Sequence, residues 1–263
     1  MKLPFFNKRK KSSLKIEVVS GTDVGLKREN NEDSCLAISG NESPGGSDAL
    51  MIVADGMGGL ATGEVASGMA IESIRRQLTE RGEDTTLPTG GYAELLAQIL
   101  RNANSEICQA GLVNDRGMMG TTCTVAVKVG NDLHIAHVGD SRAYLVRGGK
   151  LSQITTDDSW VEEQVMAGNL THEQARVHPN RNIVTQALGV RPDADVETST
   201  VILQGGEQFL LCSDGLHGLV TDEEIESIIC SNRPGEAREI LIEKAKEMGG
   251  HDNITVVIGK ISN

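Results

Sequence analysis

Short apolar runs, several of them rich in valine and isoleucine, recur along the chain and are separated by polar and glycine-containing stretches. Runs of this length and composition are typical of buried β-strands. Neighbouring runs lie close in sequence, and Gly139-Asp140-Ser141 predicts a hairpin turn within residues 133–146, so we expect largely antiparallel sheets. The candidate strands cover residues 16–19, 50–54, 122–129, 133–138, 142–146, 208–213 and 254–259.

A second pattern, with apolar residues three and four positions apart, predicts amphipathic helices. Thr221 and Glu224 form the pattern of a capping box ahead of one helix, and Pro234 is placed to open the next. Because the apolar faces of the sheets must be buried, we expect the helices to cover the sheets from outside. The predicted helices cover about residues 63–79, 92–111, 222–230 and 234–248.

The remaining segments contain predicted loops and one longer insertion. Glycine, proline and small polar residues mark loops at 39–48, 80–91 and 112–118. Residues 157–190 combine Trp160, His172 and His178 with a mixed helical pattern between two strand regions. We interpret this segment as a mobile insertion and call it the candidate flap.

Length and composition favour one domain, over residues 16–263. With 263 residues, 38% of them hydrophobic, the chain can bury one substantial core. It has no apolar run of about 18 residues and no apolar secretory stretch at its start, so we expect a cytoplasmic protein without a transmembrane segment. The five cysteines contain no C-x-x-C pair and are interpreted as reduced core residues. The net charge of −12 argues against nucleic-acid binding and suits metal cations.

Residues 1–15 form a basic tail that we expect to be flexible, with six basic side chains and no acidic one. Phe5 and Phe6 lie in the same tail, so it could touch an anionic membrane surface or an acidic partner. A frayed terminus that aids solubility explains the same composition.

Two aspartates each end a buried apolar run and are followed by glycine. Asp55 precedes Gly56, and Asp214 precedes Gly215. A strand that presents a carboxylate at its end and then turns on glycine can hold a metal ion with that carboxylate and a nearby backbone carbonyl. Each Asp-Gly pair is also common in ordinary turns, so the argument depends on the whole set of acidic residues.

Further acidic residues stand at strand ends or in loops, namely Asp252, Asp140, Glu32 and Asp33. If they meet in space, they cannot all stay ionised without cations, and oxygen ligands alone favour magnesium or manganese over zinc. Arg28 is the matching positive group, because a guanidinium can clasp two phosphate oxygens. Considered singly, Arg28 has the features of an ordinary surface arginine.

These residues belong to six motifs that resemble, in the same order, the bacterial branch of the PP2C or PPM metal-dependent protein phosphatases. The resemblance covers about residues 16 to 260 and implies an α+β fold, a four-layer αββα sandwich of two antiparallel β-sheets flanked by helices. The motifs are Gly21 to Gly25 with Arg28 and Asn31-Glu32-Asp33, then Val53 to Gly59, Gly120 to Thr122, Gly139 to Arg142, Ser213 to Gly215, and Gly250 to Asn253.

The resemblance also implies a centre of two Mn²⁺ or Mg²⁺ ions at one end of the sandwich. Carried over by position, Asp55 bridges both ions and the carbonyl of Gly56 joins it at the second. Asp214 and Asp252 match ligands of the first ion.

Other family positions have supporting roles. Glu32 matches a residue that acts on the second ion through water, and Asp33 matches one that supports this network. Asp140, together with Asp214, matches a weaker third-metal site. Arg28 matches the phosphate-binding arginine.

The implied function is hydrolysis of phosphoserine and phosphothreonine on proteins by a metal-activated water, without a phosphoenzyme intermediate. Arg28, Asp55 and Asp214 are the implied catalytic residues. The expected partners are proteins phosphorylated by a serine/threonine kinase. The expected oligomeric state is a monomer. Eukaryotic members have a histidine where this chain has Met57, so a metal-bound water is the simplest proton donor.

Two alternatives are compatible with the same fold. One is a metal-dependent phosphatase of small phosphomonoesters, which the same site could serve. The other is a phosphatase-like regulatory protein that has lost the chemistry. The presence of every metal position argues against the second alternative.

Overall fold

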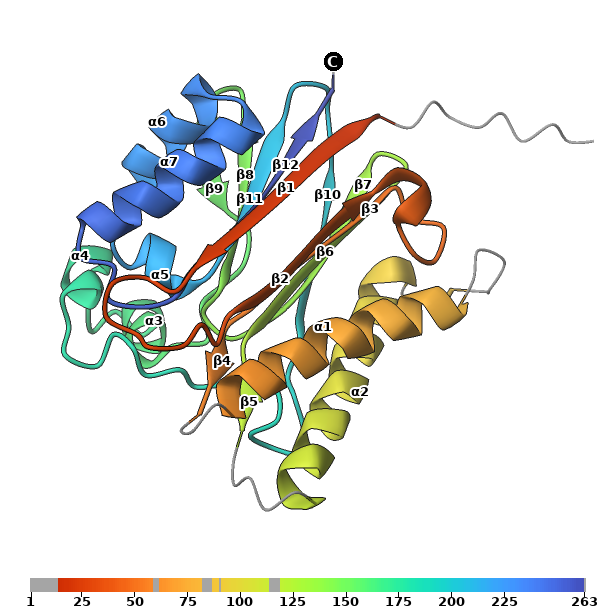
Figure 1. The fold of residues 1–263 in the computed structure, drawn as a ribbon, viewed down its shortest axis with the longest axis horizontal. Helices are drawn as coiled ribbons and strands as arrows, with labels where there is room; N and C mark the ends of the chain where they lie inside the picture. Colours follow the sequence, from red (N-terminus) through yellow and green to blue (C-terminus); the bar gives the residue numbers. More distant parts are fainter. Residues whose placement is uncertain (1–13, 59–61, 82–86, 90, 114–118, 263) are drawn as a thin grey trace, which may run out of the picture.

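Two five-stranded antiparallel sheets form the centre of the molecule in the computed structural model, which describes residues 14–58, 62–81, 87–89, 91–113 and 119–262 (Figure 1). The first sheet has the order β1 (Ile16–Asp23), β12 (Ile254–Ile261), β11 (Gln208–Cys212), β8 (Arg142–Arg147) and β9 (Lys150–Gln153). The second has the order β10 (Glu197–Ile202), β7 (Asp132–Val138), β6 (Cys123–Val129), β3 (Ala49–Ala54) and β2 (Ser34–Ser39).

Helices cover the outer face of each sheet (Figure 1). Helices α1 (Thr62–Arg81) and α2 (Gly91–Val113) pack on the second sheet, and α6 (Asp222–Ser231) and α7 (Pro234–Glu247) pack on the first. The capping box of Thr221 and Glu224 is present at the start of α6, and Pro234 opens α7. The predicted four-layer αββα sandwich is therefore confirmed.

Three apolar clusters hold the layers together. One lies between α1, α2 and the second sheet and includes Leu50 and Ile74, and another lies between α6, α7 and the first sheet and includes Leu210 and Ile225. The third fills the space between the two sheets. Alternate residues of β3 enter different clusters, since successive side chains of a strand point to opposite faces.

Short elements complete the end of the sandwich where the acidic residues gather. These are β4 (Gly56–Met57), β5 (Gly120–Thr121) and α5 (Asp214–His217). The candidate flap contains α3 (Trp160–Met166) and α4 (His172–Arg176), and a 3₁₀ turn, η1 (Gly40–Glu42), lies between β2 and β3. The structure thus adds defined helices to a segment for which the sequence predicts only a mixed pattern.

The predicted hairpin within residues 133–146 is wrong. β7 belongs to the second sheet and β8 to the first, so Gly139-Asp140-Ser141 carries the chain from one sheet to the other. Gly139 has φ of +110° and lies against the side chain of Thr122, which leaves no room for a Cβ atom. The turn residues are suited to a sharp change of direction, but they do not specify which strand the chain joins next.

Three strands of the two large sheets, β2, β9 and β10, are absent from the sequence predictions, as are the two-residue strands β4 and β5. Most residues of β2, β9 and β10 are half-buried or exposed, so these strands lack the continuous apolar runs of the central strands. Residues 1–13 of the predicted basic tail, together with 82–86, 90 and 114–118 of two predicted loops, lie outside the described residues. Within the described part of the chain, no helix is long and apolar enough to cross a membrane.

Candidate active site

The predicted site residues meet at one end of the two sheets, around a cavity of about 220 Å³ that we call the catalytic cleft. Cys212 of β11 pairs with Arg142 of β8 and with Val256 of β12, so the residues that follow β11 or precede β8 and β12 lie at the same edge. The predicted residues that line the cleft are Arg28, Glu32, Asp55, Gly56, Asp140, Asp214 and Asp252. Asp33 does not line it.

Threonine side chains hold the backbone of Asp55. Its N–H donates to Thr122 Oγ1 at 3.0 Å, and its carbonyl accepts from Thr122 N and Thr121 Oγ1, each at 2.9 Å. Thr122 Oγ1 in turn lies 2.7 Å from Ser141 Oγ. The motif that contains Thr121 and Thr122 therefore has a positioning role, although the sequence argument gave its members none.

Gly56 and Gly63 allow α1 to approach β4 closely. A Cβ atom on Gly56 would overlap the carbonyl groups of Gly63 and Glu32, and one on Gly63 would lie 2.8 Å from the backbone of Gly56. The contact brings Glu32, Gly56 and the start of α1 together. A side chain at Gly56 or Gly63 would push α1 away from β4.

Asn253 connects the loop that carries Arg28 and Glu32 to the start of β12. Its Oδ1 accepts from the backbone N–H of Glu32 at 2.8 Å, and its Nδ2 donates to the carbonyls of Val24 and Asn30, each at 3.0 Å. The side chain is 4% exposed, so these three bonds are shielded from water. Sequence reasoning placed Asn253 in a motif without assigning this role.

Asp33 lies behind the cleft, where it is hydrogen-bonded to a buried serine. Ser213 Oγ donates to Asp33 Oδ2 at 2.7 Å and accepts from the backbone N–H of Thr255 at 3.0 Å. Burial raises the pKa of Asp33 to about 7, against the opposing effect of the hydrogen bonds from Thr255 and Ser213. The structure places Asp33 next to the site and not in its lining.

The cleft concentrates more negative charge than the protein alone stabilises. Burial, followed by neighbouring carboxylates, raises the pKa values of Asp55 and Asp140 well above their ordinary range. Burial also raises the pKa of Asp214 to about 6, with Asp252 the next cause. Burial raises the pKa of Glu32, while Arg28 opposes the change. Such a centre attracts cations.

Two buried carboxylate oxygens in the described structure, Asp33 Oδ1 and Asp214 Oδ1, have no hydrogen-bond partner. A buried polar atom without a partner is costly, so a ligand that satisfies it is expected. The surrounding donors are all oxygen atoms, which fit hard divalent cations such as Mg²⁺ and Mn²⁺.

The side chains are not yet arranged as a ligand shell. In the described ranges, no three His, Cys, Asp or Glu side chains converge closely enough to hold an ion. Arg28 Nη2 donates to Asp252 Oδ2 at 2.7 Å. Cation binding at Asp252 would therefore require this carboxylate to exchange its present partner.

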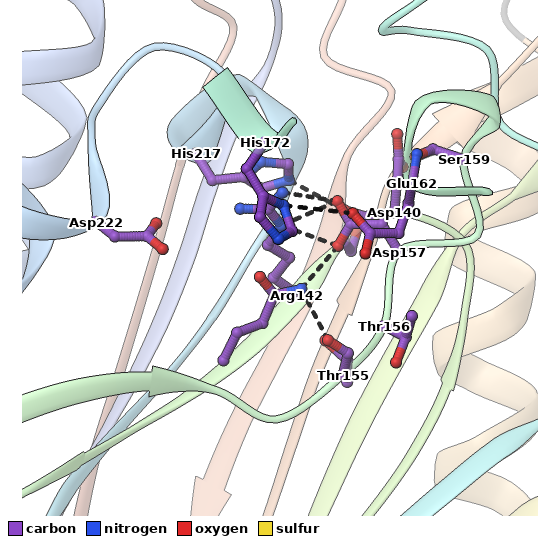
Figure 2. Close-up of polar contacts among 12 residues, drawn as sticks. Asp140, Arg142, Thr155, Thr156, Asp157, Ser159, Glu162, His172, His217 and Asp222 are labelled. Carbon is purple, nitrogen blue, oxygen red and sulfur yellow. Dashed lines mark hydrogen bonds and ion pairs between the residues drawn. The ribbon is translucent and has the colours of Figure 1, made fainter. Parts of the chain in front are cut away.

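A larger cavity of about 650 Å³, the flap cavity, adjoins the cleft and shares Asp140, Asn182 and Asp214 with it. Figure 2 shows Asp140 among the polar residues of the flap cavity. Arg142 lies at its base and forms a bidentate ion pair with Asp157, with distances of 2.7 to 3.0 Å. His172 and Glu162 of the candidate flap face the same space.

Asn182 and Val184 line the catalytic cleft but were not predicted as site residues. Both lie in the candidate flap, whose ends are fixed by bonds from Trp160 N to the Ile183 carbonyl at 2.9 Å and from Gly139 N to Asp158 Oδ2 at 2.8 Å. Their own residue types give no signal in the sequence. The only available indication was the position of the whole segment between two strand regions.

Known proteins share this sequence pattern and fold. A family profile described as protein phosphatase 2C matches residues 24–239. The protein phosphatase PhpP of Streptococcus pneumoniae is 38% identical over 244 residues, which cover 92% of this chain and 96% of the relative.

Solved structures agree. The crystal structure of the Mycobacterium tuberculosis serine/threonine phosphatase PstP/Ppp matches with a TM-score of 0.82 and 36% identity, over 94% of this chain and 99% of that one. The catalytic domain of PstP, solved in complex with two manganese ions, matches with a TM-score of 0.81 and 36% identity, over 95% and 100% of the two chains.

Proposed function

The chain belongs to the protein phosphatase 2C family and is a metal-dependent serine/threonine protein phosphatase, and we propose that its reaction takes place in the catalytic cleft at two divalent cations. The observation that carries this proposal is the buried, unpaired Oδ1 of Asp214 among carboxyls whose pKa values are raised by burial and by one another. Cations are the partners that such a group of oxygens fits.

The proposed ligands come from four separate parts of the chain. Asp55 would bridge the two ions, and the Gly56 carbonyl would serve the second, where Glu32 acts through water. Asp214 and Asp252 would hold the first ion, while Asp33 supports the network from behind through Ser213. When bound, the two cations acidify a water for attack on phosphorus and neutralise the phosphoryl oxygens.

Arg28 supplies the remaining positive charge in the described lining of the cleft. A guanidinium binds two phosphate oxygens bidentately, and here it would turn from Asp252 toward the substrate. The charge on the equatorial oxygens is thereby reduced in the transition state.

We propose that the proton for the leaving serine or threonine oxygen does not come from a histidine. The described lining of the cleft contains Met57 and no histidine. Nearby His217 has its pKa lowered to about 3, chiefly by burial, so it is neutral, and its Nε2 lies 2.9 Å from the Asp140 carbonyl. We assign the proton to a water in the cleft.

A weaker third ion would bind between Asp140 and Asp214, where the catalytic cleft meets the flap cavity. Manganese and magnesium both suit these oxygen ligands. We further propose a cytoplasmic monomer that acts on products of a serine/threonine kinase. Residues 16–263 would form its catalytic domain, with a basic tail at 1–15 and a flap at about 157–190.

Metal-dependent turnover of a peptide panel tests the proposal. The purified protein should release phosphate from phosphoserine and phosphothreonine peptides with Mn²⁺ or Mg²⁺ and lose this activity with a chelator. A phosphotyrosine peptide and a small phosphate ester serve as comparisons. Preference for the small ester over every peptide would contradict a protein substrate.

A further inference from the structure

A second cavity of about 310 Å³, the side pocket, adjoins the catalytic cleft, and neither Asp140 nor Asp214 lines it. The two cavities share Met57, Gly58 and Val184 as a common wall. Because this wall borders the cleft, a neighbour of a phosphoresidue bound there can reach the side pocket.

The side pocket has a mainly apolar lining. Besides Met57 and Val184, its walls include Ala187, Val190 and Ala194. It therefore favours an aliphatic or aromatic group over a charged one.

Gln186, a polar member of the lining, has its amide engaged elsewhere. Its Nε2 donates to Asp158 Oδ1 at 3.2 Å, and its Oε1 accepts from the backbone N–H of Asp195 at 3.3 Å. Arg191 and Asp193, which also line the pocket, are exposed. These polar groups thus do not require a polar ligand inside.

The walls are fixed by the fold. Thr121 of β5 and Leu188 exchange two backbone hydrogen bonds of 3.0 and 2.9 Å, which attach the loop of the pocket to the core. Gly189, with φ of +87°, packs against Ile107 of α2 and has no room for a Cβ atom. A Cβ atom on Gly120 would lie 2.7 Å from Val190. Such a pocket is formed before substrate arrives.

Asn104 of α2 anchors the same loop. This residue is 1% exposed, and its Oδ1 accepts from Gly189 N at 2.7 Å. Its Nδ2 donates to the carbonyls of Arg191 and Pro192 at 2.9 and 3.0 Å. The far wall of the pocket is therefore held by buried bonds that do not depend on the cleft.

We propose that the side pocket binds a large apolar side chain, such as leucine or phenylalanine, that lies within two residues of the phosphoresidue in the substrate. This inference rests on the proposed function, since it concerns the peptide that the cleft dephosphorylates. Its basis is the shared wall, the apolar lining and the fixed loop. The flap cavity, which contains several carboxylates, offers no comparable surface.

A phosphothreonine peptide with alanine at the two positions on either side is the reference substrate. Leucine then replaces one alanine at a time, and kcat and KM are measured with Mn²⁺. Leucine at one position should raise kcat/KM about tenfold, mainly through a lower KM, because the pocket binds ground state and transition state alike.

Two variants test whether the gain from leucine arises in the side pocket. Val190→Ala removes part of the wall and should reduce the gain from leucine about threefold, whereas Ala187→Leu fills the pocket and should abolish it. Val177→Ala, at a position that is 79% exposed and outside the pocket, is the matched control and should keep the full gain. If one pocket variant fails to fold, the other variant and the wild-type peptide series still test the proposal.

Equal kcat/KM across the wild-type series would overturn the proposal, as would a leucine preference that both pocket variants retain. Failure to dephosphorylate any peptide, the reference included, would contradict the proposed function itself and remove the basis of the pocket assignment with it. The two failures are therefore distinguishable.

Discussion

Arg28 and Asp252 form an ion pair in the catalytic cleft although 224 positions separate them in the chain, with 2.7 Å between Nη2 and Oδ2. The hydrogen bond to Asp252 is the largest influence on the raised pKa of Arg28. One residue is proposed to bind phosphate and the other a cation. Cation binding at Asp252 would release Arg28, so metal should precede substrate.

Arg28→Ala should raise KM for phosphopeptides and lower kcat/KM by roughly 10- to 100-fold, because a charge-assisted bidentate contact is lost. Arg28→Lys keeps the charge without the fork and should be intermediate. Arg75→Ala, which breaks an exposed pair on α1, is the control and should have no effect. Steady-state kinetics of each variant provide the test. An unchanged kcat/KM in Arg28→Ala would show that Arg28 does not bind the substrate.

Asp55→Asn should abolish phosphatase activity, since a neutral amide cannot bridge and neutralise two dications as a carboxylate does. Calorimetric titration with Mn²⁺ should show loss of tight binding. Asp195→Asn, at an exposed position, is the matched control. Full manganese-dependent turnover in Asp55→Asn would refute the bridging assignment.

Asp140→Ala should lower activity while both tight sites still load with metal. Asp140 is 5% exposed and shares the boundary between the cleft and the flap cavity with Asp214. We propose that it belongs only to the weaker third site, so its removal should leave the two tight sites intact. Turnover and Mn²⁺ calorimetry on the same preparation provide the test. Disappearance of both tight sites would place Asp140 in the binuclear core.

Asn253→Ala should lower kcat and destabilise the fold by about 1–3 kcal/mol, because the backbone groups of Val24, Asn30 and Glu32 lose buried partners. Thermal denaturation and steady-state kinetics are the measurements. Asn232→Ala removes one side-chain bond, from Nδ2 to the Ile228 carbonyl, and should leave kcat unchanged because Asn232 does not line the cleft. Equal kcat in wild type and Asn253→Ala would argue against a positioning role.

The ion pair of Arg142 and Asp157 should stabilise the fold near neutral pH, and this stabilisation should be lost in acid. Burial alone would raise the pKa of Asp157, but the charge and hydrogen bonds of Arg142 outweigh it and the pKa is lowered from 3.8. A lowered folded-state pKa means that the contribution is complete above the unfolded pKa and is lost as pH falls through the folded one. The loss therefore lies below about pH 3.8.

Asp157→Asn should cost about 3 kcal/mol near neutral pH, since Arg142 is left as a largely buried charge, 19% exposed, without its bidentate partner. The deficit should shrink as wild type loses the same interaction in acid. Urea denaturation at several pH values measures it, with Glu72→Gln as the exposed-pair control. A deficit that stays constant with pH would contradict the assigned pKa direction.

Local patterns predicted much of the fold. The central strands and the four long helices follow from apolar periodicity and caps, because burial on one or both faces selects those residue types. β9 and β10 escaped prediction because their side chains are mostly half-buried or exposed. The hairpin at Gly139-Asp140-Ser141 failed since turn residues set a local direction and not a partner strand.

By itself, the sequence determined which residues have the chemistry of the site, from the aspartates at strand ends to Arg28 and the order of the motifs. Only the tertiary structure decided how those residues meet. Strand pairing at Cys212 brings Asp140, Asp214 and Asp252 to one edge, while a hydrogen bond from Ser213 holds Asp33 behind the cleft. The side pocket of Met57, Val184 and Val190 is likewise a product of packing between distant segments, because no local pattern encodes the distance between a loop and a strand that it contacts only in the folded chain.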